Sequence, residues 1–327
     1  MSRKLLLLLL CSMLVLSVAP TASTAQSDTI TIGFLPGVVD PFYQVMQLGV
    51  EAAAKDMGVT VVTQVPPTWG VEVQTPILDA MVARGDLDYI ITAPTDKDQM
   101  VGPLQSAVDA GIGVITVDTF LGDGDYVNGP VTFPISYIGS DNVEGGRIAA
   151  RGLAAAIGGK GKVYINTTNP NVSSVEGRAI GFEEVMKNEY PDITIVGMDY
   201  NLDDMNTATQ QTAAVLETNP DLAGIFGTNV FSAQGAGTAV VNAGLSGQVQ
   251  VVAYDATQFA IEMLRDGTVS LVLAQKPFDM GYMAVQFAVA DHAGVTSLPR
   301  RVQTGFAIID INNVDDPAVA RFIYQVP

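Results

Sequence analysis

The sequence contains very little of the chemistry on which enzymes and metal sites depend. Its 327 residues include one cysteine, Cys11, and one histidine, His292. A zinc site that uses two histidines is therefore excluded. A Ser-His-Asp relay would require the single histidine in a cleft, whereas His292 lies on the face of a predicted helix, where a structural role is favoured. We accordingly predict no catalytic residue, no metal site and no cofactor.

Basic residues and phosphate-binding motifs are also scarce. The chain has 16 Lys and Arg residues against 34 Asp and Glu residues, a formal net charge of −18. So acidic a surface repels nucleic acid and anionic lipid, and neither is an expected partner. Gly235-Ala236-Gly237 lacks the third glycine of a dinucleotide turn and lies within a predicted helix. Asp123-Gly124-Asp125 lacks the remainder of a calcium loop and is interpreted as a turn.

Residues 1–25 have the organisation of a secretory signal peptide. Two basic residues precede an apolar run that continues to Val18, and Ser23-Thr24-Ala25 suits cleavage before Gln26. A membrane anchor is the main alternative, but it needs roughly 20 apolar residues and this run is shorter. A lipoprotein would need a cysteine at the cleavage site, whereas Cys11 lies inside the run. We expect an exported protein, periplasmic or extracytoplasmic, without stable membrane insertion after cleavage and without disulfides.

The remainder of the chain alternates apolar, β-branched runs with segments of helical period. This alternation predicts an α/β protein with parallel sheets. The polar, Gly-rich stretch 122–134 has no regular period and separates two series of units, so we predict two doubly wound halves. The expected strands are Thr29–Pro36, Val59–Val65, Tyr89–Ala93, Gly113–Val117, Tyr137–Gly139, Lys162–Asn166, Ile193–Gly197, Gly224–Gly227, Val249–Ala253, Val269–Ala274 and Thr304–Asp310. Expected helices include Pro41–Met57, Val71–Arg84, Asp98–Ala110 and a last helix, Phe278–His292.

Polar side chains follow four of these strands at the point where the apolar run stops. They are Asp118, Asn229, Asp255 and Gln275. In open parallel sheets, ligands bind beyond the carboxyl ends of the strands. Carboxylates and carboxamides placed there would hydrogen-bond a small polar molecule, because charge-assisted bonds are strong and an amide both donates and accepts. The alternative for each aspartate is a helix cap without a ligand.

Two further positions point to the same crevice. Asp40 and Pro41 suit the cap and first position of a helix, which would place Phe42 and Tyr43 near the crevice, where aromatic faces suit the apolar patches of sugars. Arg178 lies near the start of a predicted helix, against the macrodipole. We therefore expect a fixed partner for it, such as Asp255 or the ligand.

In this order and spacing, the motifs resemble the periplasmic sugar-binding proteins of bacterial ABC transporters, in the ribose-binding-like group. The signposts are Asp40-Pro41-Phe42-Tyr43, Val-Ile-Thr-Val-Asp118, Ile-Gly-Ser-Asp-Asn142, Arg178 in Arg-x-x-Gly-Phe, Asn229, Val-Val-Ala-Tyr-Asp255 and Leu-Ala-Gln275-x-Pro277. The resemblance departs from the ribose pattern at Thr119, where that pattern has arginine, and at Met205, near an expected aromatic. The loop between Asp118 and Ser140 is also longer.

The resemblance implies two Rossmann-like lobes joined by a three-segment hinge near Ile138–Ser140, Gln275–Pro277 and Val302–Gly305. The N-terminal lobe would comprise residues 26–138 plus 276–303, and the C-terminal lobe residues 139–275 plus 304–327. Carried over residue by residue, Phe42 and Tyr43 stack on the sugar, and polar groups bind its hydroxyls. The full set of expected ligand-binding residues is Asp40, Phe42, Tyr43, Asp118, Thr119, Arg178, Met205, Asn229, Asp255 and Gln275.

These observations predict a solute-binding protein, a monomer, that captures a neutral monosaccharide (a pentose, hexose or deoxy sugar) and delivers it to an ABC permease. One alternative is a sugar sensor that docks on a chemoreceptor or kinase ectodomain. Another is a secreted hydrolase that uses Asp118 and Asp255 as an acid–base pair.

Overall fold

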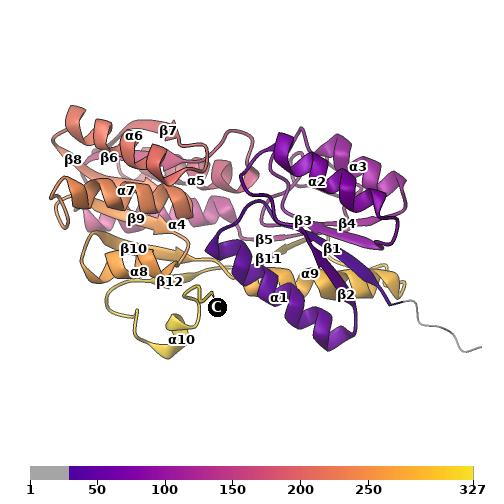
Figure 1. Cartoon of the computed structure of the whole chain (residues 1–327). Coiled ribbons are helices and arrows are strands. Elements are labelled where there is room, and N and C mark those ends of the chain that lie inside the picture. The colour runs from indigo at the N-terminus through magenta and orange to yellow at the C-terminus, as the bar shows by residue number, and fades with distance from the viewer. Residues whose placement is uncertain (1–28, 327) are drawn as a thin grey trace, which may run out of the picture.

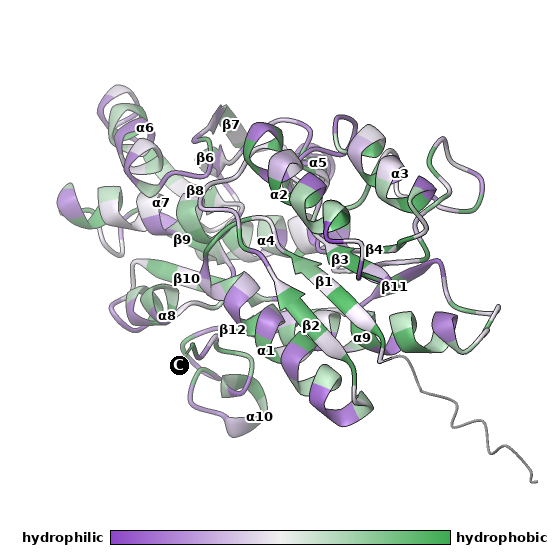
Figure 2. Ribbon diagram, turned by 45° about the vertical axis from the view of Figure 1, so that its right-hand side comes forward, coloured by the Kyte–Doolittle hydropathy of each residue, from purple (hydrophilic) through white to green (hydrophobic). Residues whose placement is uncertain are grey.

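The computed structural model describes residues 29–326, which form two six-stranded sheets with helices on both faces of each (Figure 1). The expected signal peptide, with Cys11, lies outside the described residues. Within residues 29–326, every helix is too short or too polar to span a bilayer. Figure 2 shows the central strands in the hydrophobic colour and the helices in two colours, which agrees with sheets buried between amphipathic helices.

The first sheet has the order β11-β5-β4-β3-β1-β2, and its strands pair in parallel throughout. Its strands are β1 Thr31–Leu35, β2 Thr60–Thr63, β3 Tyr89–Thr92, β4 Gly113–Val117, β5 Tyr137–Gly139 and β11 Arg301–Gln303. Helices α1 Pro41–Met57 and α9 Pro277–His292 pack together on one face, and α2 Val71–Ala83 and α3 Val101–Asp109 cover the other (Figure 1).

The second sheet has the order β12-β10-β9-β8-β6-β7, and only the edge strand β12 runs antiparallel. Its strands are β6 Gly161–Thr167, β7 Ile193–Tyr200, β8 Leu222–Gly227, β9 Gln250–Tyr254, β10 Val269–Ala274 and β12 Ala307–Ile309. Its helices are α4 Asn142–Ala156, α5 Ser173–Glu189, α6 Met205–Thr218, α7 Val230–Asn242 and α8 Gln258–Arg265; a short α10, Pro317–Ala320, follows β12. The prediction of two doubly wound α/β halves is confirmed.

The chain passes between the two sheets three times. It crosses after β5 toward α4, after β10 toward α9, and between β11 and β12. These crossings lie beside Ser140, Gln275 and Thr304. Thr304 N donates to Gly139 O at 3.0 Å, which ties the third crossing to the first. The prediction of one strand over Thr304–Asp310 is wrong in its first part, because residues 304–306 form the crossing and the neighbouring strand β11 precedes them. His292 ends α9, which is not the last helix, since α10 follows.

Each half contains a helix pair in which glycine lets the two backbones approach closely. A Cβ on Gly181 of α5 would lie 1.9 Å from Val143 O of α4, and one on Gly146 of α4 would lie 2.0 Å from Arg178 O. In the other half, Gly49 of α1 and Gly281 of α9 are equally restricted by backbone oxygens, at 2.1 and 2.2 Å. Because backbone cannot move aside as a flexible side chain can, these contacts fix the spacing of the helices beneath the sheets.

We predict that Gly181→Ala lowers the free energy of unfolding by about 1–3 kcal/mol, because the added methyl group forces α4 and α5 apart. Gly102→Ala is the matched control: Gly102 is an exposed glycine in α3 and has nothing within 4 Å of its Cβ position. Gly102→Ala should leave the free energy of unfolding unchanged or raise it by about 0.5–1 kcal/mol. Chemical denaturation measures both, and equal stability of the two variants would contradict this account of the α4–α5 contact.

Candidate ligand-binding site

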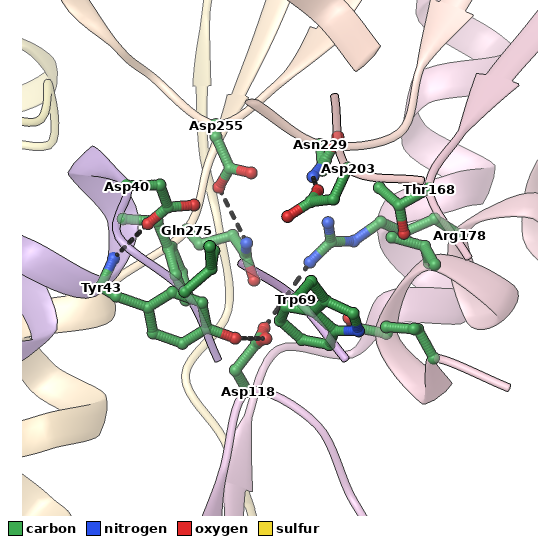
Figure 3. Close-up of a pocket in the computed structure, with 15 residues that line it drawn as sticks. Asp40, Tyr43, Trp69, Asp118, Thr168, Arg178, Asp203, Asn229, Asp255 and Gln275 are labelled. Atoms are coloured by element: carbon green, nitrogen blue, oxygen red, sulfur yellow. Dashed lines mark hydrogen bonds and ion pairs between the residues drawn. The ribbon is translucent and has the colours of Figure 1, made fainter. Parts of the chain in front are cut away.

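A cavity of about 380 Å³ lies between the two halves, at the carboxyl ends of the strands (Figure 3). Both halves contribute to its wall, which combines aromatic rings, aspartates and one arginine. The residues that line it are Val38, Asp40, Phe42, Tyr43, Trp69, Asp118, Thr168, Val172, Ser174, Val175, Arg178, Asp203, Asn229, Asp255 and Gln275. Eight of the ten residues predicted from the sequence lie in this wall.

The start of α1 builds one side of the cavity as its sequence predicts. Asp40 caps the helix, with Oδ1 accepting from Tyr43 N at 2.7 Å, and Pro41 occupies the first turn. This cap directs Phe42 and Tyr43 inward, where their rings meet edge to face at 5.0 Å. The Tyr43 hydroxyl donates to Asp118 Oδ2 at 2.8 Å, so the helix start is bonded directly to the end of β4 (Figure 3).

Trp69 is a wall residue that the sequence reasoning missed. It lies in the loop before α2, its ring stacks on Tyr43 with centroids 6.4 Å apart, and its Nε1 donates to Thr95 O at 2.9 Å. Both contacts hold the ring in one orientation at the cavity. The signal available in the sequence was the single tryptophan of the chain, placed in a loop that follows a strand of a parallel sheet.

Asp118 and Asp255 end strands in opposite halves and share an uncommon backbone conformation. Their φ angles are 58° and 74°, in the left-handed region that aspartate tolerates better than most residues. The main chain is fixed on both sides: Asp118 N donates to Ile138 O at 3.0 Å, and Asp255 N donates to Leu273 O at 2.8 Å. The turn thus presents each carboxylate to the cavity at the strand end, as the sequence predicted.

Gln275 joins the cavity to the crossings. Its Nε2 donates to Asp255 Oδ1 at 2.8 Å, and its Oε1 accepts from Ser140 Oγ at 2.8 Å. Both ends of the amide are therefore bonded within the protein. The hydroxyl of Tyr324 also donates to Asp255 Oδ1, at 2.9 Å. Gln275 consequently orients a carboxylate of the wall and at the same time links two of the three crossings.

Arg178 is buried and held by groups of its own half. Its Nε donates to Asn142 Oδ1 at 2.9 Å, an Nη donates to Thr228 O at 2.7 Å, and its guanidinium carbon lies 3.9 Å from the centroid of Tyr254. The other Nη lies 3.9 Å from Asp118 Oδ1, in the opposite half. The partner suggested by the sequence, Asp255, makes no ion pair with Arg178 within the described part of the chain.

Asp203 is a second residue that the sequence reasoning missed. It precedes α6, has φ 61°, and accepts on Oδ1 from Asn229 Nδ2 at 2.7 Å. Asn229 in turn caps α7, with Oδ1 accepting from Ser232 N at 3.0 Å. Asp203 follows the end of β7, so the strand-end rule that selected Asp118 would also have found it. The edge strand β7 ends in two exposed residues, Asp199 and Tyr200, so its apolar run has no clear end in the sequence.

Four carboxyl groups thus surround a cavity that contains one guanidinium. Burial raises the pKa of Asp118 to about 6 and the pKa of Asp203 to about 7. Burial also raises the pKa of Asp40 well above its usual value, and that of Asp255 in the same direction. Mutual repulsion adds to the effect at Asp40, Asp118 and Asp203, while the charge of Arg178 opposes it at Asp118 and Asp255.

Each of the four carboxylates uses one oxygen for the protein. The bonded oxygens are Asp40 Oδ1, Asp118 Oδ2, Asp203 Oδ1 and Asp255 Oδ1. No side chain of the described residues donates a hydrogen bond to the second oxygen of any of the four. The wall therefore orients its carboxylates through protein donors and offers further acceptors to a molecule that brings donors of its own. Residues 29–326 hold no cluster of His, Cys, Asp and Glu suited to a metal ion.

Two predicted residues lie outside the cavity wall. Thr119 is 1% exposed and its Oγ1 donates to Pro94 O at 2.8 Å, so its hydroxyl bonds a neighbouring loop. Met205 is the first residue of α6 and is 36% exposed. Both were selected from the spacing of the resemblance, which does not determine whether the side chain faces inward. The structure thus does not bring Thr119 and Met205 into the wall with the other eight predicted residues.

Comparison with known proteins agrees with this geometry. A model of the periplasmic binding protein domain matches residues 32–294. A ribose import binding protein of Bacillus subtilis is 26% identical over 87% of this chain and 88% of its own. A D-ribose/D-allose-binding protein of Pseudomonas aeruginosa is 27% identical, over 90% of this chain and 92% of its own.

Solved structures extend the likeness to the whole architecture. An ABC transporter solute-binding protein of Agrobacterium vitis, bound to α-D-tagatopyranose, is 46% identical, covers 91% of this chain and 100% of its own, and superposes with a TM-score of 0.88. Another from the same organism, bound to D-fucose, is 28% identical with a TM-score of 0.84 and covers 90% and 100%. From the matched domain, the two sheets and the wall of strand-end side chains between them, we conclude that the chain belongs to the periplasmic binding protein family.

Proposed function

We propose that this protein is an exported solute-binding protein that holds a neutral monosaccharide between its two halves and delivers it to an ABC permease. The observation that carries the proposal is the set of four oriented carboxyl groups, each with one oxygen to which no side chain of the described residues donates a hydrogen bond. The family is one of substrate-binding proteins rather than enzymes, and the relatives serve sugar import.

The charge of the wall favours a neutral molecule with many hydroxyl groups. Hydroxyls donate to carboxylates in strong, charge-assisted bonds. An added carboxylate or phosphate on the ligand would lie among four carboxyl groups with only Arg178 to oppose it. Uronic acids and sugar phosphates should therefore be excluded.

The aromatic side of the wall complements the polar side. Phe42, Tyr43 and Trp69 form one connected group of rings, and aromatic faces suit the apolar C–H faces of a sugar ring. The relatives bind ribose, allose, arabinose, fucose and tagatose, according to their names and the sugars in their structures. D-Tagatose, from the relative that shares 46% of its residues with this chain, is the first sugar to test.

Contacts between the halves support a clamp that closes on its ligand. Lys97 N donates to Asn171 O at 3.0 Å, and Phe120 N donates to Ser173 Oγ at 2.8 Å. We assign residues 26–138 plus 276–303 to one lobe and residues 139–275 plus 304–327 to the other, with the hinge at the three crossings. Closure would form the surface that a permease recognises. One chain supplies both walls, which favours a monomer.

Asp118→Ala and Asp255→Ala should each weaken sugar binding by about 2–4 kcal/mol, because each removes a charged acceptor and leaves its protein donors without a partner. Calorimetry with D-ribose, D-allose, D-arabinose, D-fucose and D-tagatose measures the effect. Asp221→Ala, at an exposed residue paired with Lys162, is the control and should bind as the wild type does. If the wild type binds no mono- or disaccharide more tightly than millimolar, the sugar assignment is wrong.

Sugar binding should change the intrinsic fluorescence of Trp69, because the only tryptophan of the chain lines the cavity and would lose contact with water there. Emission spectra recorded during a titration should follow the same dissociation constant as calorimetry. Trp69→Phe should remove the signal while calorimetry still detects binding. An emission spectrum that stays constant while calorimetry reports saturation would place the sugar away from Trp69.

The ligand-free protein should lose stability as the pH rises from about 4 to about 7. Burial raises the pKa of Asp203 to about 7 in the folded state, so folding favours the protonated form, and that contribution is lost as the pH climbs through this window. Asp203→Asn keeps an acceptor for Asn229 and should show a smaller fall in Tm between pH 5 and pH 8. Asp204→Asn, the control, removes an exposed charge at the adjacent position and should show the same fall in Tm as the wild type. Equal falls in all three proteins would count against this role of Asp203.

A further inference from the structure

The segment after β12 returns to the junction between the two sheets. Residues 310–326 contain only the short helix α10, and most of their side chains are exposed or partly exposed. Tyr324 is an exception, at 3% exposed. Figure 1 shows this segment, in yellow, turning back beside the hinge. A segment with so little regular structure of its own therefore places one large polar side chain in the interior.

Tyr324 contacts three parts of the binding machinery at once. Its hydroxyl donates to Asp255 Oδ1 at 2.9 Å and accepts from the main-chain N of Gln275 at 3.2 Å. Its ring centroid lies 6.2 Å from that of Phe42. Its own main-chain N donates to Ala256 O at 2.8 Å, which anchors the segment next to Asp255. One residue thus links a carboxylate of the second half, a hinge crossing and an aromatic of the first half.

The hydroxyl of Tyr324 determines which oxygen of Asp255 remains for a ligand. Oδ1 accepts from both Gln275 Nε2 and the hydroxyl of Tyr324, so the carboxylate is held from two directions, and neither of these side chains donates to Oδ2. Tyr324 does not line the ligand cavity. It lines a second hollow of about 730 Å³ beside the second crossing, and Gln275 lines both. Tyr324 therefore bonds Asp255 and Gln275 without being part of the cavity wall.

We propose that Tyr324 is a positioning residue of the ligand site, which fixes the orientation of Asp255 and the hinge amide of Gln275 so that both are ready for the sugar. This inference rests on the proposed function. It predicts that the loss of one oxygen atom, outside the cavity wall, weakens binding, because the carboxylate gains rotational freedom and the Gln275 N–H loses its acceptor.

The test compares Tyr324→Phe with Tyr126→Phe. Tyr126 is 2% exposed and lies outside the cavity wall. Like that of Tyr324, its hydroxyl bonds one side chain and one main-chain N–H: the Thr116 hydroxyl at 2.8 Å and Leu121 N at 3.0 Å. The two variants lose the same number of bonds at similar burial, and they differ in that Tyr324 bonds a carboxyl group whereas Tyr126 bonds a hydroxyl. Both are titrated by calorimetry with the sugar of the panel that binds the wild type most tightly, and their Tm values are measured without ligand.

We expect Tyr324→Phe to weaken binding about tenfold, and Tyr126→Phe to stay within about twofold of the wild type while losing a comparable amount of thermal stability. Wild-type affinity in Tyr324→Phe would overturn the inference, and so would an equal loss of affinity in both variants, since that would be a general effect of instability. A wild-type protein that binds no sugar would instead defeat the proposed function, which separates the two failures.

Discussion

The burial of four carboxyl groups beside one guanidinium is the constraint on which the site depends. Each carboxylate loses hydration when the two halves come together, and the raised pKa values of Asp118 and Asp203 express that cost. Side-chain and cap bonds of the described residues offset that cost at one oxygen of each group. A molecule with several hydroxyl donors satisfies the remaining acceptors. Closure of the two halves is therefore more favourable with such a molecule bound than without it. Recognition and closure are thus parts of one electrostatic balance.

Compensation of this desolvation cost by a ligand requires two rigid halves that are joined by a flexible hinge. The glycine contacts between α4 and α5, and between α1 and α9, hold backbone against backbone beneath each sheet. Between the sheets, by contrast, the chain crosses in three short segments. Hydrogen bonds join these segments to one another, such as those from Ser140 to Gln275 and from Thr304 to Gly139. In the proposed clamp, the side chains on the two sides of the cavity form two sets, and a ligand that bonds to both sets would stabilise one relative position of the halves.

The sequence predicted the fold and most of the wall because both follow from the geometry of parallel sheets. Buried strands appear as continuous apolar runs, and side chains at their carboxyl ends meet at one edge, so Asp118, Asn229, Asp255 and Gln275 could be selected without coordinates. The cap at Asp40 followed from local backbone chemistry. These inferences needed only the order of residues within one element.

The residues that were missed depend on contacts that no local pattern records. Trp69 lies in a loop, and its orientation is set by Tyr43 and Thr95. Tyr324 belongs to an irregular segment whose path is determined where it meets Ala256 and Gln275. Thr119 lies outside the wall for the complementary reason: it adjoins a wall residue, yet the left-handed turn at Asp118 directs its hydroxyl to Pro94. Position along the chain places a residue near the cavity, but the bonds of its own side chain decide whether it faces the ligand.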